Sequence, residues 1–235
     1  MSAARSRGSK TDLPVDCRPV IVALAGPNGA GKTTFYHAHL QPAGLRFVNA
    51  DVLARELNLD PYAAARVADV LRRQLVEQRE SFVFETVFSD PVGDKLAFLK
   101  EAVGKGYTVV LCFIGISGPE VSEERVAMRV SQGGHDVPTE KLVARFPRTM
   151  ANLKTAIRDL PQVWMFDNDD LRKPFRQAAI FENGQRVKLN EPTPEWLAPL
   201  LPQRHELRRI APAPRFLARL RIKSRPFSLS AALGE

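Results

Sequence analysis

A short glycine-rich stretch near the amino terminus constrains this chain more than any other feature. Residues 26–35 read GPNGAGKTTF and directly follow the apolar run VIVALA. Gly26, Gly31, Lys32 and Thr33 fill the pattern G-x-x-x-x-G-K-[ST], in which backbone N–H groups and the start of a helix surround phosphate oxygens. The pattern predicts a phosphate-binding loop between a buried strand and a helix, and hence a nucleoside triphosphate as ligand.

The predicted loop gives two of its side chains defined roles. Lys32 is expected to contact the β- and γ-phosphates, and the Thr33 hydroxyl is expected to bind Mg²⁺. The cofactors predicted are ATP and Mg²⁺, while the choice between adenine and guanine stays open. The residues expected to bind ATP are Gly26, Pro27, Asn28, Gly29, Ala30, Gly31, Lys32, Thr33 and Thr34.

The chain downstream of the loop alternates between short apolar runs and amphipathic segments. This alternation predicts an α/β fold with a mainly parallel sheet and helices on both faces. Asn183 and Gly184 separate two apolar-polar runs at 178–189, which predicts a hairpin at an antiparallel edge. We expect a three-layer P-loop NTPase sandwich with five or six strands. Strands are expected at 19–25, 46–49, 81–87, 107–115 and 163–167, and helices at 62–80, 94–106, 119–131 and 138–159.

The positive charge lies at the two ends of the chain. Of the net charge of +8, residues 203–235 contribute eight Lys or Arg against two Glu, and residues 1–18 contribute four against two Asp. The remaining 184 residues are neutral, so the basic balance says little about the site. We expect a flexible segment at 1–18, one domain at 19–202 and a basic, Pro/Arg-rich tail at 203–235. The tail could bind RNA, membrane phosphates or a partner, or be a solvated terminus.

Other classes of protein do not fit the composition. The longest apolar runs, such as 108–116, are shorter than the roughly 20 residues that a membrane span needs. The first 17 residues lack the apolar core of a secretory signal. Cys17 and Cys112 are the only cysteines, which indicates neither a disulfide framework nor a zinc site. A cytoplasmic location is therefore expected.

Two carboxylates fall where phosphoryl transfer would need them. Transfer requires a group that orients the acceptor hydroxyl, and Asp51 follows the strand at 46–49, on the edge where such sheets bind ligands. The alternative is that Asp51 only caps the next helix. Glu85, with Thr86 beside it, lies near the end of an otherwise apolar strand and needs a partner. We expect Glu85 and Thr86 to bind the acceptor; Mg²⁺ or an arginine of the body are other partners for Glu85.

Two helices rich in arginine form the expected lid. Gly133 and Gly134 between them predict a hinge, and Pro138 suits the start of the second helix. Closure would bring guanidinium groups onto the phosphates, although each arginine taken alone is as plausible on a solvated surface. The four arginines lie in pairs three or four residues apart: Arg125, Arg129, Arg145 and Arg148.

The order of these segments resembles the zeta-toxin family of P-loop kinases over about residues 19–190. The matching segments read VALAGPNGAGKTTF, FVNADVLARE, SFVFETVFS, GGHDVPTEKLVARFPRTMANL and VWMFDND. The resemblance implies a nucleotide-kinase-like fold, and it implies that the acid and amide of FDND support the nucleotide or the sheet edge. It also implies catalytic roles for Lys32 and for Asp51 as the acid that activates the acceptor. The further residues implied are Glu85 and Thr86 at the substrate, and Arg129 and Arg145, with Arg148 sharing their role, at the γ-phosphate.

Zeta toxins phosphorylate UDP-activated amino sugars, such as UDP-N-acetylglucosamine, at the 3′-hydroxyl, and many are held inactive by a small antitoxin. The resemblance therefore implies an ATP-dependent kinase of this type and allows an antitoxin protein as a partner. One alternative is a polynucleotide or nucleotide kinase that uses the basic tail to bind RNA. Another is a nucleotide-gated binding module, against which Asp51 and Glu85 argue because a switch needs no acceptor base.

Overall fold

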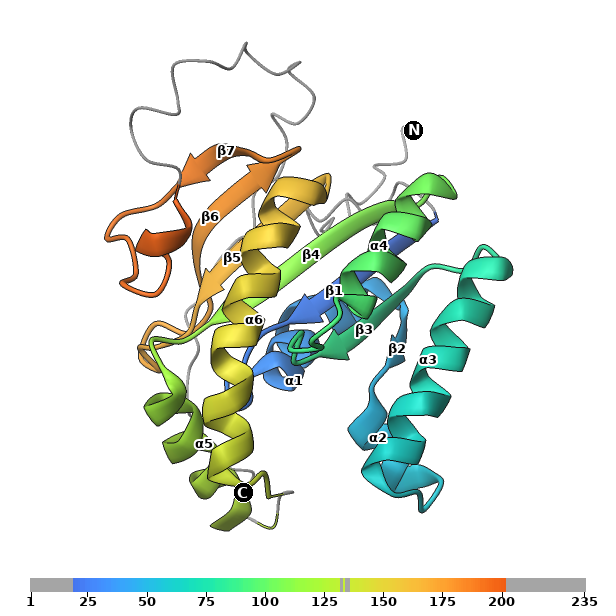
Figure 1. The fold of residues 1–235 in the computed structure, drawn as a ribbon, viewed down its shortest axis with the longest axis horizontal. Coiled ribbons are helices and arrows are strands. Elements are labelled where there is room, and N and C mark those ends of the chain that lie inside the picture. Colours follow the sequence, from blue (N-terminus) through green and yellow to red (C-terminus); the bar gives the residue numbers. More distant parts are fainter. Residues whose placement is uncertain (1–18, 132, 134–135, 202–235) are drawn as a thin grey trace, which may run out of the picture.

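The computed structural model describes residues 19–131, 133 and 136–201 (Figure 1). The segment predicted at 1–18, the hinge residue Gly134 and the basic tail at 203–235 lie outside the described residues, so the division of the chain into three segments stays a prediction. Among the helices that are described, none combines the length and the apolar character that crossing a membrane would require.

Seven strands form one sheet in the order β2-β3-β1-β4-β5-β6-β7. β1 to β5 pair in parallel, and β6 and β7 are antiparallel. The mainly parallel sheet and the edge hairpin are confirmed. The expected number of five or six strands is too low, because β6 and β7 both join the same sheet. The strands are β1 (Val20–Ala25), β2 (Arg46–Val48), β3 (Phe82–Thr86), β4 (Thr108–Gly115), β5 (Gln162–Asp167), β6 (Arg176–Glu182) and β7 (Gln185–Leu189).

Helices cover both faces of the sheet and complete the three layers. Residues of α3, α4 and α6 pack in one buried cluster on one face, and α4 and α6 cross in front of the sheet in Figure 1. Residues of α1 and of the π-helical turn after it pack on the other face. The helices are α1 (Lys32–Phe35), η2 (Tyr36–Leu40), η3 (Gln41–Ala43), α2 (Ala50–Glu56), α3 (Pro61–Glu77), α4 (Asp94–Gly104), α5 (Pro119–Ser131), α6 (Thr139–Asp159) and η4 (Ala198–Leu200).

β1 is buried along its whole length and sits at the centre of this arrangement. Its alternate residues point to the two clusters, as the period of a strand requires: Ile21 and Ala23 to one, Val22 and Leu24 to the other. β3 and β4 flank β1 on opposite sides, and Ala25 pairs with Thr86 at the end of β3 and with Phe113 near the end of β4. The loop after β1 therefore begins at a point where the strand order diverges, which is where open α/β sheets bind ligands.

The chain after β7 returns to pack on the carboxyl end of β4. Trp196 is 5% exposed, and its indole N–H donates to Asp167 Oδ1 at 2.9 Å. The indole ring lies against Gly115, where a Cβ would come within 2.2 Å of Trp196 Cζ2. Only glycine at position 115 leaves room for the indole ring, so the packing of Trp196 on the end of β4 depends on this glycine.

We expect Gly115→Ala to destabilise the fold because the added methyl overlaps a buried ring. The expected loss in free energy of unfolding is about 1–3 kcal/mol, which urea denaturation would measure. Gly104→Ala is the matched control, since a Cβ at Gly104 meets nothing within 4 Å. It should stay within about 1 kcal/mol of the wild type. Equal stability of the two variants would contradict the account of the Trp196 contact.

Candidate functional site

The loop after β1 has the strand-loop-helix geometry that the sequence predicts. Gly26 and Gly31 have φ values of 148° and 87°, which L side chains rarely adopt. Space is as restrictive as the backbone: a Cβ would lie 2.2 Å from Ile114 O at Gly26, and 2.8 Å from Asn168 Nδ2 at Gly31. α1 begins directly after the loop, at Lys32. Backbone N–H groups of loop and helix can thus converge on one anion.

Two distant segments hold the loop in this shape. The Ser122 hydroxyl on α5 donates to Asn28 O at 2.6 Å. The Asn168 side chain, 3% exposed at the end of β5, donates to Ala30 O at 2.9 Å and accepts from Phe175 N at 3.3 Å. The resemblance implied a supporting role for this amide, and the structure places it on the loop itself.

Lys32 is buried inside the loop, 6% exposed. Its amine donates to Gly26 O at 3.0 Å and to Pro27 O at 2.9 Å, and it lies 3.9 Å from Glu85 Oε1. Burial lowers the pKa of Lys32, while the negative charges of Glu85 and Asp51 oppose that shift. Two of the three N–H groups of the ammonium ion donate to these carbonyls, which leaves the third to donate to a phosphate oxygen.

Glu85 joins the loop to β2. Glu85 Oε2 accepts from the Thr33 hydroxyl at 2.8 Å and from Asn49 Nδ2 at 2.9 Å. The alternative that Glu85 pairs with an arginine of the body is wrong, because these groups and Lys32 surround it. Thr86 lies at the end of β3, where its hydroxyl accepts from Phe88 N at 3.0 Å. The structure thus brings Lys32, Thr33 and Glu85 together, with Thr86 adjacent in the chain.

Asp51 lies beside this group at the start of α2. Asn49 is the N-cap of that helix: its Oδ1 accepts from Asp51 N at 2.8 Å and from Val52 N at 3.3 Å. The alternative that Asp51 caps the helix is therefore wrong. Within the described part of the chain, the Asp51 carboxylate has no hydrogen bond of its own. It is exposed, and it lies close enough to Lys32 to act on the pKa of that amine.

The arginines of the expected lid lie at different distances from the loop. Arg125 packs against it, since a Cβ on Gly29 would lie 3.1 Å from Arg125 Cβ. Its Nη2 donates to Asp169 O at 2.9 Å, and its Nη1 is buried without a partner among the described residues. Arg129 lies near enough to lower the pKa of Lys32. Arg125 belongs in the candidate site, although sequence reasoning placed it only in the lid.

Arg145 is half-buried and Arg148 is exposed on α6, and no hydrogen bond joins either side chain to the loop within the described residues. Their contact with the γ-phosphate stays a prediction. Pro138 is the residue before α6 begins, as predicted, and Gly133 has a φ of 84° in the connection.

The part of α6 before Pro147 is less deeply packed than the rest: Leu142 is its one buried residue, and Phe146 packs partly buried against the second cluster. Beyond Pro147, Thr149 Oγ1 donates to Val87 O and Asn152 Nδ2 donates to Phe88 O, both at 3.0 Å. Leu153 and others on the same face are buried in the core. Pro147 itself cannot donate a backbone hydrogen bond to the preceding turn. The expected lid helix is thus one continuous helix, half of which belongs to the core.

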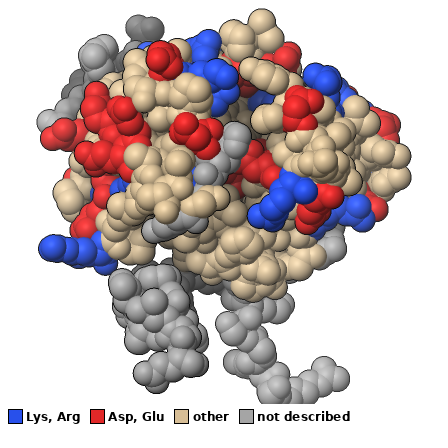
Figure 2. Space-filling view, turned by 90° about the horizontal axis from the view of Figure 1, so that it is seen from below, with Lys and Arg blue, Asp and Glu red and all other residues tan. Residues whose placement is uncertain are grey.

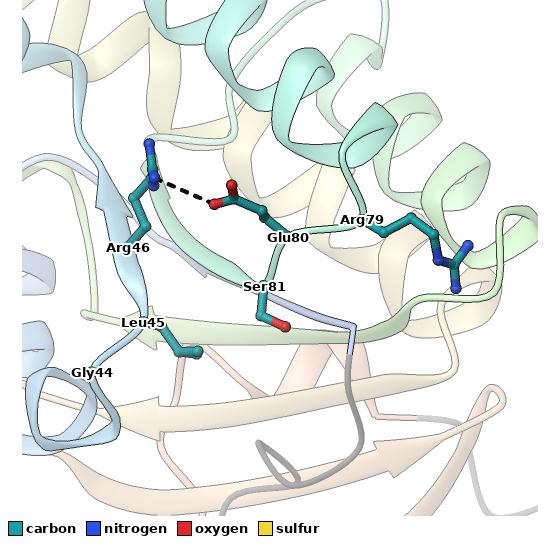
Figure 3. A pocket seen from close by; sticks show the side chains of 6 residues that line it. All are labelled: Gly44, Leu45, Arg46, Arg79, Glu80 and Ser81. Atoms are coloured by element: carbon teal, nitrogen blue, oxygen red, sulfur yellow. Dashed lines mark ion pairs between the residues drawn. The ribbon is translucent and has the colours of Figure 1, made fainter.

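A cavity of about 440 Å³ lies beside the amino-terminal ends of β2 and β3, whereas the site residues lie at the carboxyl ends of the strands (Figure 3). Arg46 and Glu80 form an ion pair of 3.3 Å on its wall, and Arg79 donates to Lys105 O. The cavity contains none of the predicted site residues.

Figure 2 shows the end of the molecule to which α2 and α5 extend. Basic and acidic side chains are interspersed over the part of this face that is not drawn in grey, as expected from the balanced charges of residues 19–202.

We expect Asn168→Ala to weaken the loop, because Ala30 O and Phe175 N lose their shared partner. The variant should lose about 1–3 kcal/mol in free energy of unfolding and bind ATP less tightly in calorimetry. Asn190→Ala is the control, since it removes a similar bond, Nδ2 to Gln177 O at 2.7 Å, away from the loop. It should lose stability but keep its ATP affinity. An unchanged ATP affinity in Asn168→Ala would contradict the role of the clamp.

Comparisons with known proteins bear on the family and the fold of the chain. Residues 21–151 match the family described as AAA domain. An uncharacterized protein of Haemophilus influenzae is 29% identical over 130 residues, which cover 53% of this chain and 91% of that protein.

Two solved structures are similar in fold. The crystal structure of AvrRxo1-ORF1:-ORF2 with ATP has a TM-score of 0.58 at 20% identity, and covers 74% of this chain. The PezAT chromosomal toxin-antitoxin system of Streptococcus pneumoniae has a TM-score of 0.52 at 15% identity, with 83% of this chain and 80% of that chain covered. This chain spans only 61% of the AvrRxo1 chain that it matches. The family match covers more than half of the sequence. The chain therefore belongs to the AAA domain family, and its architecture is the kinase-like α/β fold of P-loop NTPases.

Proposed function

We propose that residues 19–202 form an ATP-dependent kinase domain that transfers the γ-phosphate to a hydroxyl of a small molecule. The observation that carries the proposal is the convergence of two loop residues, Lys32 and Thr33, with two carboxylates from other elements, Glu85 and Asp51. A site that only bound a magnesium nucleotide would need Lys32, Thr33 and a carboxylate such as Glu85. Asp51 is a further carboxylate, and it can receive a proton from an acceptor.

The loop and the arginines bind the triphosphate in this proposal. Loop backbone N–H groups and Lys32 hold the phosphates, and on binding the Lys32 amine exchanges the carbonyls of Gly26 and Pro27 for phosphate oxygens. The buried, unpartnered Nη1 of Arg125 provides a donor at the same loop. Arg129, Arg145 and Arg148 neutralise charge on the γ-phosphate when the lid closes. The AvrRxo1 complex, which holds ATP, supports ATP as the donor.

Thr33 and Glu85 fit a magnesium ion. Their oxygens lie 2.8 Å apart beside the phosphate loop, and hydroxyl and carboxylate oxygens are the ligands that Mg²⁺ prefers. Mg²⁺ usually takes one or two protein ligands together with substrate phosphates, so no larger cluster of protein ligands is needed. When bound, the ion neutralises charge on the β- and γ-phosphates.

Asp51 is the proposed general base. Because Asn49 caps α2, the Asp51 carboxylate is left to accept a hydrogen bond from the acceptor hydroxyl. It takes the proton as the hydroxyl oxygen attacks the γ-phosphorus, and ADP leaves on the opposite side. Glu85 and Thr86 position the acceptor next to Asp51.

A UDP-activated amino sugar is the proposed acceptor. The order of the loop, Asp51, Glu85 and lid segments supports this choice through the resemblance to zeta toxins. The similar fold of the pneumococcal toxin-antitoxin structure extends the proposal to an antitoxin-like protein as partner.

We expect Asp51→Asn to lower the rate of phosphate transfer by about 10²–10⁴-fold, because the amide cannot accept the proton. The affinity for ATP should change little, since Asp51 does not hold the phosphates. The measurement is ADP formation with UDP-N-acetylglucosamine, together with ATP binding by calorimetry. Glu56→Gln, an exposed carboxylate on the same helix, serves as the control and should keep wild-type turnover. Wild-type turnover in Asp51→Asn would sink the proposed mechanism.

We expect Glu85→Gln to weaken the affinity of the site for magnesium. The substitution keeps the shape of the side chain but removes its charge, so the Mg²⁺ concentration for half-maximal ATP binding should rise by about 10–100-fold. Glu80→Gln, beyond the opposite end of β3, is the control because Glu80 pairs with Arg46 far from the loop. Identical Mg²⁺ titrations of the two variants would show that Glu85 does not serve the ion.

A further inference from the structure

The helix that presents Asp51 also presents a second charged side chain on the same face. Arg55 lies four residues after Asp51 in α2, and residues four apart on a helix have Cβ atoms about 5–6 Å from each other. Long helical side chains lean toward the amino terminus, which directs Arg55 back toward Asp51. Both residues are exposed. Asn49 ties the start of α2 to the phosphate loop, because it accepts from Asp51 N and donates to Glu85, which in turn accepts from the Thr33 hydroxyl.

The fold makes no use of the Arg55 charge. Among the described residues, no hydrogen bond or ion pair involves its guanidinium group, although an ion pair with Asp51 would be within the reach of an i, i+4 spacing. α2 is anchored instead by Leu53, which packs against the core, and by the Asn49 cap. Several other arginines of the chain are paired with carboxylates: Arg46 with Glu80, Arg72 with Asp69, Arg158 with Asp159 and Arg176 with Asp167.

The charges of the site require a cation for an anionic acceptor. With Glu85 occupied by Mg²⁺, the Asp51 carboxylate is the charge on the acceptor side, and it would repel a phosphate or carboxylate group there. Lys32 lies within the phosphate loop, where the triphosphate takes it up. A neutral acceptor would need no further cation, whereas an anionic one needs a guanidinium group placed beyond the base, as Arg55 is.

We propose that Arg55 is a specificity-determining residue that binds an anionic group, a phosphate or a carboxylate, of the acceptor. The inference rests on the proposed kinase function and assigns to Arg55 the recognition of the negative charge that a sugar-nucleotide acceptor carries. The guanidinium group offers paired donors that match phosphate or carboxylate oxygens. Asp51 and Arg55 lie about one helical turn apart, so the two side chains can contact different parts of the same acceptor.

The test compares the binding of paired acceptors that differ in charge. The probes are UDP-N-acetylglucosamine against N-acetylglucosamine, and glucose 6-phosphate against glucose. Each is titrated by calorimetry into protein saturated with Mg²⁺ and a non-hydrolysable ATP analogue, which occupies the phosphate loop. The variants are Arg55→Gln, the conservative Arg55→Lys, and Arg66→Gln as an exposed-arginine control on α3.

The wild type should bind at least one charged probe more tightly than its neutral partner. Arg55→Gln should weaken that binding by about 10–100-fold, while Arg55→Lys recovers part of it and Arg66→Gln behaves as the wild type. The melting temperature and the affinity for the ATP analogue should not change. These two readouts would separate a lost binding contact from a damaged fold.

The inference is overturned if Arg55→Gln binds the charged probes as well as the wild type does. It is also overturned if the wild type never prefers the charged member of a pair. Transfer assays on the same probes keep this outcome apart from failure of the proposed function. Charge-dependent binding without phosphate transfer would contradict the proposed kinase function but not the role of Arg55 in binding. Phosphate transfer without a preference for charged probes would support the kinase function and contradict the role of Arg55.

Discussion

The contact between the backbone of the phosphate loop and its neighbours is the constraint on which the rest of the site depends. Gly26 lies against Ile114 O and Gly31 against Asn168, both too closely for a side chain. Because β1 runs between β3 and β4, this packing fixes the loop among the carboxyl ends of three parallel strands. The same packing buries Lys32 and brings Glu85 to the Thr33 hydroxyl.

Much of the fold could be predicted because short residue patterns along the chain specify its elements. The apolar run before the loop, the Asn183-Gly184 turn and the helix after Pro138 all lie where residue pattern placed them. The number of strands could not be predicted, since a turn signal does not say which sheet the second strand of a hairpin joins. Nor could amphipathicity alone reveal that α6 belongs to the core beyond Pro147, because both halves carry apolar residues at helical spacing.

The candidate site was predictable to a similar extent and for a similar reason. Lys32 and Thr33 begin the helix after β1, Asp51 lies in the first turn of the helix after β2, and Glu85 is the penultimate residue of β3, all positions that the chain order locates. The sequence could not decide which residue caps α2, because Asn49 and Asp51 are both favourable N-cap residues. In the structure Asn49 is the cap, and its side chain also donates to Glu85, which is distant in the sequence. Arg125 was missed as a neighbour of the loop because its contact with Gly29 exists only in the packed molecule.

The central claim is that this loop delivers a phosphoryl group to an alcohol held beside it. The most direct measurement is incubation of the full chain with ATP labelled at the γ-phosphate and a panel of sugar nucleotides, nucleosides and RNA, followed by mass spectrometry. The account predicts one labelled phosphate on a hydroxyl of a sugar nucleotide. Tight binding of ATP with no label on any acceptor, or label on RNA alone, would contradict it.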